Sequence, residues 1–392
     1  MSPAGLIAWV SAAHVLSMTG FATYPALLPR LQAEWVMSNT EAGLVSGLFF
    51  AGYMAAVPVL TALTDRIDAR RIYVVASVVA AAGTAAFALA QGPVSGGLAQ
   101  LLVGVGIAGT YMPGLRALTD NTTGIAQTRA VSFYTAFFGV GVSLSLVIAQ
   151  QIADAFDWRA AFVAAAIGPL IAAAMVVLGL PARQPRGAVA PNKLLDFRPV
   201  LANREASRYI YGYAVHCWEL FGSRSWMVAF LTFAQTIVPS PLSPAAIHAV
   251  ANLGSPFASI VGNEAALRVG RGKVIALGMA LSGLLTCTLG FGAGLPWLLV
   301  AILVAVHMLL VMSDSSTLTA GMVAAADPRF KGATMAVHST LGFGMGFVSP
   351  LVFGAALDLA GGNQSALAWG VAFVTLGLGG IAAPFLLGFV RR

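Results

Sequence analysis

Charged residues are scarce in this sequence, and that scarcity excludes the ordinary water-soluble folds. Only 9% of the 392 residues are Asp, Glu, Lys or Arg, whereas 58% are hydrophobic. A soluble protein cannot cover so much apolar surface with so few polar side chains. The charges lie in short gaps between about twelve apolar stretches, each close to the roughly 20 residues that a helix needs to cross a bilayer. We therefore expect an all-α, polytopic membrane protein.

Cysteine and catalytic signatures are also lacking. The two cysteines, Cys217 and Cys287, form no Cys-x-x-Cys pair, and we interpret both as small buried hydrophobes. The sequence has no Walker motif, zinc-ligand cluster or nucleophile elbow. The spacing Gly104-x-Gly106-x-x-Gly109 resembles a dinucleotide fingerprint, but no strand precedes it, so we treat the match as chance. We expect a protein that is not an enzyme, uses no cofactor or metal, and is not driven by ATP.

The remaining charges predict the orientation of the spans. The predicted spans lie near residues 5–29, 41–63, 71–91, 95–119, 128–153, 159–180, 207–237, 243–267, 273–292, 295–325, 332–358 and 365–389. Lys and Arg are concentrated in every second gap, so the positive-inside rule predicts that both termini and all even-numbered gaps are cytoplasmic. The net charge of +7 is then a topology signal, and we expect no nucleic-acid partner. The first span lacks a basic start, so we expect no cleavable signal peptide.

One long polar gap divides the chain. Residues 181–206 are rich in Pro, Arg and Asn and predict a cytoplasmic linker between an N-terminal six-helix bundle, residues 1–180, and a C-terminal one, residues 207–392. The halves look related, because Phe138-Gly139-Val140-Gly141 in span 5 and Leu341-Gly342-Phe343-Gly344 in span 11 lie about 200 residues apart. Two six-span repeats around a midplane site are typical of a transporter.

Three segments resemble motifs of the major facilitator superfamily of secondary transporters. They are Leu63-x-Asp65-Arg66-x-x-x-Arg70-Arg71 after span 2, Gln100-x-x-x-Gly104-x-Gly106-x-x-Gly109 in span 4, and Asp157-Trp158-Arg159-x-x-Phe162 at the start of span 6. The resemblance implies twelve transmembrane helices in two pseudo-symmetric six-helix bundles that rock about a central site. It also implies that helices 1, 4, 7 and 10 line the cavity and that helices 3, 6, 9 and 12 face lipid.

The sequence departs from the family pattern at several positions. The signature loop usually has Gly where this chain has Thr61 and Asp68, and the span-4 motif usually has Arg where this chain has Gln100. Drug–proton antiporters of the superfamily usually carry a Gly-Pro pair in helix 5, whereas residues 139–145 contain no proline. The last two departures argue against drug efflux.

Charges near the cytoplasmic helix ends are the candidate gating residues. By resemblance, Asp65 and Arg70 of the signature loop form a latch with Asp120 at the end of span 4, and Arg66 lies in the same loop. In the second half, Glu264 and Arg268 are four residues apart and therefore share a helix face. The alternative is a set of ordinary positive-inside residues with a helix-end acid.

Span 7 is the richest in polar and aromatic side chains. It carries Tyr209, Tyr211, Tyr213, His216, Trp218, Glu219, Ser223, Arg224 and Trp226. His216, Glu219 and Ser223 recur at helical spacing on one face, and Arg224 points away from that face. A carboxyl group at mid-bilayer, such as Glu219, suits reversible proton binding. The alternative for Glu219 and Arg224 is a structural bridge to another helix.

Spans 1, 4 and 10 supply the other candidates. In span 10, His307 and Asp314 are seven residues apart on one face, and Ser315 follows. In span 4, Arg116 follows Tyr111, and it can bind an anion or pair with Asp120 within its own helix. The candidate substrate-binding residues are Arg116, Arg224, Tyr111, His14, Tyr24, Tyr213, Trp218 and Ser315. The candidate proton-coupling residues are Glu219, Asp314, His216 and His307. His248 and His338 are weaker candidates, more often packing residues.

These observations predict a secondary active transporter that moves a small, carboxylate-like organic anion by alternating access, coupled to protons. The alternatives are proton-driven efflux of hydrophobic or cationic drugs, with Glu219 and Asp314 as the negative charges, and a non-transporting receptor or scaffold. We expect a monomer in the lipid bilayer whose partners are a small-molecule substrate and protons. The preference for Ala and for Arg over Lys is typical of GC-rich bacterial genomes, so we expect the bacterial cytoplasmic (inner) membrane.

Overall fold

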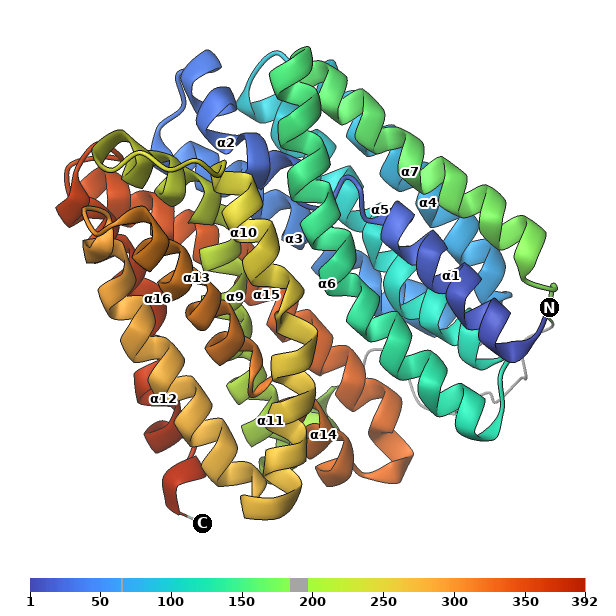
Figure 1. Cartoon of the computed structure of the whole chain (residues 1–392). Coiled ribbons are helices and arrows are strands. Elements are labelled where there is room, and N and C mark those ends of the chain that lie inside the picture. The colour runs from blue at the N-terminus through green and yellow to red at the C-terminus, as the bar shows by residue number, and fades with distance from the viewer. Residues whose placement is uncertain (65, 184–196, 392) are drawn as a thin grey trace. The chain divides into compact units, whose positions relative to one another are not determined.

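The computed structural model describes residues 1–64, 66–183 and 197–391, and every regular element in them is a helix (Figure 1). The elements before the linker are α1 (Pro3–Ser17), α2 (Thr23–Glu34), α3 (Asn39–Leu63), α4 (Ala69–Ala88), α5 (Pro93–Thr119), α6 (Gly124–Ala155) and α7 (Trp158–Gly179). Those after it are α8 (Arg198–Ala202), α9 (Arg204–Ile237), α10 (Pro244–Leu253), α11 (Ser255–Val269), α12 (Arg271–Leu289), α13 (Trp297–Met312), α14 (Ser315–Ala325), α15 (Lys331–Leu359) and α16 (Ala366–Leu386). Three short 3-10 turns, η1 (Gly290–Gly292), η2 (Pro328–Phe330) and η3 (Phe389–Arg391), complete the described elements.

The twelve predicted spans correspond to these helices, which confirms the predicted fold class. Ten segments of the described chain are long and apolar enough to cross a membrane. The other two are the first span, which is divided into α1 and α2, and the seventh, α9, which carries several charged residues. Spans 8 and 10 are also divided, into α10 and α11 and into α13 and α14.

The chain forms two compact units. Unit 1 comprises Met1–Leu27 and Leu48–Lys193, and unit 2 comprises Leu28–Gly47 and Leu194–Arg392. The segment Leu28–Gly47, which ends α2 and begins α3, therefore packs with the second half of the chain.

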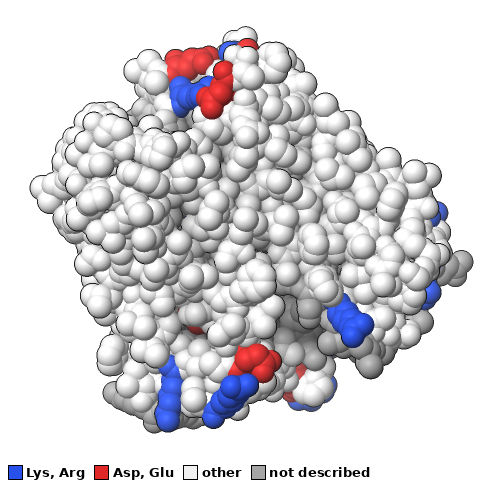
Figure 2. Space-filling model, viewed as in Figure 1, with Lys and Arg blue, Asp and Glu red and all other residues white. Residues whose placement is uncertain are grey.

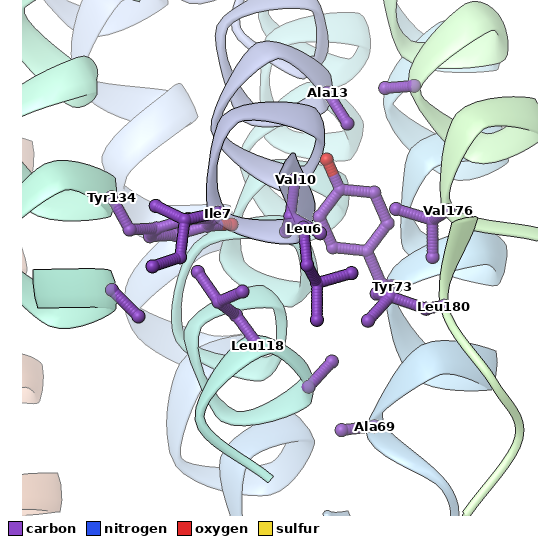
Figure 3. Close-up of a cluster of buried hydrophobic side chains, with 13 residues drawn as sticks. Leu6, Ile7, Val10, Ala13, Ala69, Tyr73, Leu118, Tyr134, Val176 and Leu180 are labelled. Atoms are coloured by element: carbon purple, nitrogen blue, oxygen red, sulfur yellow. The ribbon is translucent and has the colours of Figure 1, made fainter. Parts of the chain in front are cut away.

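The interior of unit 1 is an apolar core between α1, α4, α5, α6 and α7 (Figure 3). Val10, Tyr73 and Val176 are each fully buried in it. The hydroxyl of Tyr134 reaches across the core and donates to the carbonyl of Thr110, 2.7 Å away, so that this buried polar group is satisfied. The core thus fixes α1 and α6 against α5. Candidate residues of this unit lie on α1, which carries His14, and on α5, which carries Tyr111 and Arg116.

The outward faces of several helices are apolar, as a lipid-facing surface requires. Leu277, Leu281 and Leu284 recur at helical spacing on α12 and are exposed. Val163, Ile167, Leu170 and Leu178 do the same on α7. Helices α12 and α7 are the predicted spans 9 and 6, two of the four expected to face lipid. Figure 2 shows where charge lies instead, since nearly all the charged side chains visible there lie near the ends of helices.

The break in the first span is stabilised by side chains of unit 1. Between α1 and α2, the hydroxyl of Ser145 on α6 donates to the carbonyl of Thr19, at 2.7 Å, and accepts from the backbone N–H of Ala22, at 3.0 Å. The hydroxyl of Thr19 donates to the carbonyl of Ala165 on α7, at 2.6 Å. Backbone groups released by a helix break must be satisfied inside a membrane protein, and these bonds do so.

In unit 2, the beginning of α3 packs tightly against the end of α15. A Cβ atom on Gly43 would collide with the carbonyl oxygen of Pro350, and one on Gly47 with that of Phe347, so only glycine permits this approach. The carboxylate of Asp358 accepts from the backbone N–H groups of Asn39 and Thr40, at 3.1 and 2.8 Å. It also accepts from their side chains, at 2.7 and 2.6 Å. Asp358 therefore caps α3, where the helix dipole favours a negative charge.

Candidate functional site

Helix α9 carries most of the candidate residues and is anchored at its start. The side chain of Asn203 accepts from the backbone N–H of Ala206 at 3.1 Å and caps a helix of 34 residues. His216, Glu219 and Arg224 are all buried along its length. The helix therefore brings ionisable groups into the interior of unit 2, where each must have a partner or bind a ligand.

Glu219 of α9 lies in the interior of unit 2 against residues of α12, α13 and α16. Its Oε1 accepts from the hydroxyl of Thr286 at 2.7 Å, and its Oε2 accepts from that of Ser282 at 3.3 Å. His307 Nε2 of α13 lies 3.6 Å from Oε1. A Cβ atom on Gly380 of α16 would be 2.8 Å from Oε2, so the helix passes directly over the carboxylate. Glu219 is thus held by two hydroxyl donors next to a histidine.

Asp314 and His216 form the second buried pair. Asp314 lies at the break between α13 and α14, and its Oδ1 is 2.8 Å from His216 Nδ1 on α9. The His216 ring stacks beside that of Tyr213, with centroids 5.5 Å apart. Tyr213 in turn stacks on His338 of α15 at 3.8 Å. The break in span 10 therefore brings the carboxylate to α9, and three rings continue from it toward α15.

Arg224 is the one candidate cation that lies inside unit 2. The residue is only 7% exposed, and its Nε–H group has no hydrogen-bond partner. No carboxylate oxygen in the described ranges lies within ion-pair distance of its guanidinium. Arg224 is therefore a buried guanidinium without a counter-ion among the described residues. A buried guanidinium without a counter-ion is energetically costly. Removing one partner of a buried ion pair, which creates the same situation, typically costs several kcal/mol of stability.

The candidates of unit 1 form an aromatic cluster. His14 on α1 stacks on Tyr134 of α6, with ring centroids 4.2 Å apart, and on Tyr111 of α5, at 5.5 Å. His14 is fully buried, and neither of its ring nitrogens has a hydrogen-bond partner. This unit therefore offers an unpaired imidazole among aromatic rings.

Three other predicted substrate-binding residues, Tyr24, Trp218 and Arg116, make contacts outside these clusters. Tyr24 packs edge-on against Phe87 in unit 1, at 5.8 Å. The Trp218 Nε1–H group donates to the carbonyl of Thr375 on α16, at 3.1 Å. Arg116 pairs with Asp120 one helical turn away, at 3.1 Å, which is the intrahelical alternative named above. Ser315 begins α14, directly after Asp314.

Only some residues of the predicted cytoplasmic latch lie in the part of the chain that the structure describes. Asp65 lies outside the described residues. Arg70 donates to the carbonyl of Val177 at the end of α7, at 2.5 Å. Arg66, Glu264 and Arg268 have exposed side chains. The latch between Asp65, Arg70 and Asp120 therefore stays a prediction.

Sequence reasoning missed three polar residues that complete these clusters. Ser282 and Thr286 were overlooked because span 9 was expected to face lipid, although their spacing of four residues places them on one helix face. Asn252 was also overlooked, although it follows His248 by one turn on α10. Polar residues at helical spacing in an otherwise apolar span were the available signal.

Comparisons with known proteins give the family context. A model of the Major Facilitator Superfamily matches residues 10–254. Human monocarboxylate transporter 11 is 28% identical over 401 aligned positions, which cover 99% of this chain and 78% of that protein. Protein spinster homolog 3 of Danio rerio is 30% identical over 170 residues, which are 42% of this chain and only 34% of the relative's length. The crystal structure of a bacterial homologue of the human lysosomal transporter Spinster has a TM-score of 0.77 at 14% identity, covering 99% of this chain and 98% of that one.

Proposed function

We propose that this chain, which belongs to the Major Facilitator Superfamily and is a transporter, moves a small organic anion across the membrane. We also propose that this movement is coupled to protons. The anion carries a carboxylate, and the two halves of the chain expose its site to each side of the membrane in turn. The observation that carries the proposal is the buried guanidinium of Arg224. The likeness to monocarboxylate transporter 11 along 99% of this chain supports a carboxylate as the substrate class.

Arg224 supports anion binding because a ligand would supply the charge that the protein does not. A guanidinium donates several hydrogen bonds in a fixed plane that matches the two oxygens of a carboxylate. The Nε–H group is buried without an acceptor, and the whole residue is 7% exposed. A bound carboxylate would accept from this N–H and neutralise the charge.

The two buried carboxylate–imidazole pairs support proton coupling. Asp314 lies 2.8 Å from His216, and Glu219 lies 3.6 Å from His307. Each pair can bind protons in two steps, starting from a neutral imidazole beside a carboxylate. The first added proton makes the imidazole positive and gives an ion pair, and a second, on the carboxyl group, leaves the pair with a net positive charge. Such pairs inside a membrane protein are typical of proton relays. An inward proton gradient can then drive uptake of the anion.

The direct test is uptake by purified protein in liposomes under an imposed pH gradient. We expect protonophore-sensitive accumulation of labelled monocarboxylates, and a loss of about tenfold or more in Arg224→Ala, equal to about 1.4 kcal/mol of lost binding. Lys273→Ala, which removes an exposed cation near the start of α12, is the matched control and should transport normally.

The proposal fails if Arg224→Ala moves every tested carboxylate like the wild type. Export of cationic dyes that depends on Glu219 and Asp314, in place of carboxylate uptake, would instead support the drug-efflux alternative.

Alternating access also needs contacts that form when a gate closes and break when it opens. The contact in unit 2 between the start of α3 and Asp358 at the end of α15 is a candidate for such a gate contact. By the positive-inside rule this end of α3 is extracellular, and it is held by four bonds to one carboxylate of Asp358. We propose that these bonds close the extracellular gate and break when the gate opens. They complement the latch expected at the cytoplasmic ends.

A cysteine pair tests this gate. The Thr40 hydroxyl donates to Asp358 at 2.6 Å, so the thiols of Thr40→Cys and Asp358→Cys would lie close enough for a short bifunctional thiol reagent to join them. Cross-linking should abolish uptake, while each single cysteine variant should be insensitive to the reagent. Equal uptake before and after verified cross-linking would contradict the gate.

A further inference from the structure

Helices α10 and α11 carry a buried polar face that the proposed function does not use. His248, Asn252, Ser255 and Ser259 follow one another at spacings of four, three and four residues, so they share one side of the helix pair. All four are buried, with exposures of 1%, 0%, 2% and 8%. At one end of this face, Ser259 is paired with Ser316 of α14, with hydroxyl oxygens 2.5 Å apart. At the other end, His248 and Asn252 bond to each other.

Those bonds fix which atoms of His248 and Asn252 donate and which accept. The Asn252 Nδ2 group donates one hydrogen to the backbone carbonyl of His248, at 2.8 Å, which sets the orientation of the amide. Its second hydrogen points to His248 Nε2, 3.1 Å away, so Nε2 is the acceptor and the ring proton is on Nδ1. Within the described residues, the Nδ1–H of His248 and the Oδ1 of Asn252 then have no partner.

This donor and this acceptor lie on a helix that packs against the helix of Arg224. Helix α10 contacts α9, which carries Arg224, and α13, which carries His307. These helices therefore carry buried N–H donors on Arg224 and His248 and a buried oxygen acceptor on Asn252 that have no hydrogen-bond partner in the described residues, and the Ser255 hydroxyl on the same face has none either. Buried polar groups are nearly always hydrogen-bonded, so such a group of unpartnered atoms on neighbouring helices indicates a ligand.

We infer that His248 and Asn252 form a recognition site for a hydroxycarboxylate, beside the guanidinium of Arg224. This inference rests on the proposed anion function and extends it to the substrate's second polar group. The carboxylate accepts from Arg224 and from His248 Nδ1–H, and the neighbouring hydroxyl donates to Asn252 Oδ1. A keto acid has no hydrogen to donate and leaves this oxygen unpaired. An amino acid would bring an ammonium group next to a guanidinium, which repels it.

The test compares matched carboxylates on the purified full-length protein. The probes are lactate, pyruvate, propanoate and alanine, together with phenyllactate and phenylpyruvate as a larger pair, and binding is measured as a shift in thermal unfolding. Wild-type protein should bind each hydroxy acid about tenfold or more tightly than its keto partner, because an unpaired buried group discriminates strongly. This measurement needs no variant. Equal binding of hydroxy and keto acids, or binding of alanine equal to that of lactate, would overturn the assignment.

Variants then locate the site. Asn252→Leu removes the oxygen acceptor in a side chain of similar size, and the hydroxy-to-keto ratio should fall to about one. Ser259→Ala, on the same polar face but bonded to Ser316, should keep the wild-type ratio. If Arg224→Ala abolishes carboxylate binding while Asn252→Leu keeps the ratio, the hydroxycarboxylate site is wrong and the anion transporter stands. If no carboxylate binds to wild-type protein, both fail.

Discussion

Units 1 and 2 bury the same pair of ring types at equivalent helices but differ in charge. In unit 1, His14 on the first span stacks on Tyr134 of the fifth, at 4.2 Å. In unit 2, Tyr213 on span 7 stacks on His338 of span 11, at 3.8 Å. The histidine and the tyrosine have exchanged helices, while the stack is retained.

The difference lies in what surrounds each stack. Around His14 lie aromatic rings and no carboxylate within ion-pair distance among the described residues, whereas Tyr213 adjoins the pair of His216 and Asp314. Four of the five histidines of the chain, two buried carboxylates and the buried arginine belong to unit 2. The two units therefore share a histidine–tyrosine stack at corresponding spans, while most of the buried ionisable side chains lie in unit 2.

The largest effect that tests this difference between the units is expected when the charge of Glu219 is removed. Glu219→Gln keeps an oxygen that can accept from Thr286, which is 2.7 Å from Oε1, but it cannot exchange a proton. We expect uptake driven by a pH gradient to fall about tenfold or more, about 1.4 kcal/mol. Exchange of labelled for unlabelled substrate without a gradient should persist. Normal gradient-driven uptake in the variant would contradict the role of unit 2 in coupling.

A change at Asp358 tests the capped end of α3. Asp358→Asn removes the negative charge that four donors on Asn39 and Thr40 share. Loss of a charged helix cap should lower the free energy of unfolding by about 1–2 kcal/mol. Thermal unfolding in detergent measures this change, and Glu264→Gln, which removes an exposed carboxylate of α11, is the control. An unchanged unfolding midpoint would mean that the cap contributes no stability.

A smaller effect should separate the histidines of the two units. His14→Phe keeps a planar ring in the stack and removes two buried nitrogens that have no partner, so we expect stability to stay equal or rise by about 1 kcal/mol. His248→Phe leaves the second hydrogen of the Asn252 amide without its acceptor and should lower stability by about the same amount. Thermal unfolding of both variants gives the comparison. A loss of stability in His14→Phe would show that its nitrogens are satisfied in solution.

The smallest effect is expected at a half-buried carboxylate of unit 2, outside the membrane-spanning helices. Asp327 lies between α14 and η2, and the side chain of Arg329 holds its pKa below the usual 3.8, at about 2. Because this pKa is lowered on folding, the stabilisation is present above about pH 4 and is lost only as the pH falls through about 2. Asp327→Asn should therefore leave the profile of uptake between pH 5 and 8 unchanged. A shifted profile would mean that coupling is not confined to the buried carboxylates.

Much of the fold and part of the site could be predicted from the sequence. Apolar runs of bilayer length predicted the helices, because these depend on local composition. The family was predicted from the resemblance of three short motifs, at residues 63–71, 100–109 and 157–162, and the family model confirms it. Helical spacing also predicted that His216 and Glu219 share a face. Their partners were not predictable, because contacts between helices depend on rotation and tilt. The hydrogen-bond donors to Glu219 are Ser282 and Thr286, from a span that was expected to face lipid.

The sequence by itself determined that this chain is a membrane-embedded bundle with a few buried ions, since the cost of placing charge in hydrocarbon restricts where those ions can occur. Only the tertiary structure decided that Arg224 is left without a counter-ion among the described residues. The pairing of Arg116 with Asp120 is local and was one of the two possibilities that their spacing of four residues offered. The neighbours of Arg224 instead depend on helix packing, which brings side chains within the few ångströms over which electrostatic and hydrogen-bond energies are decided.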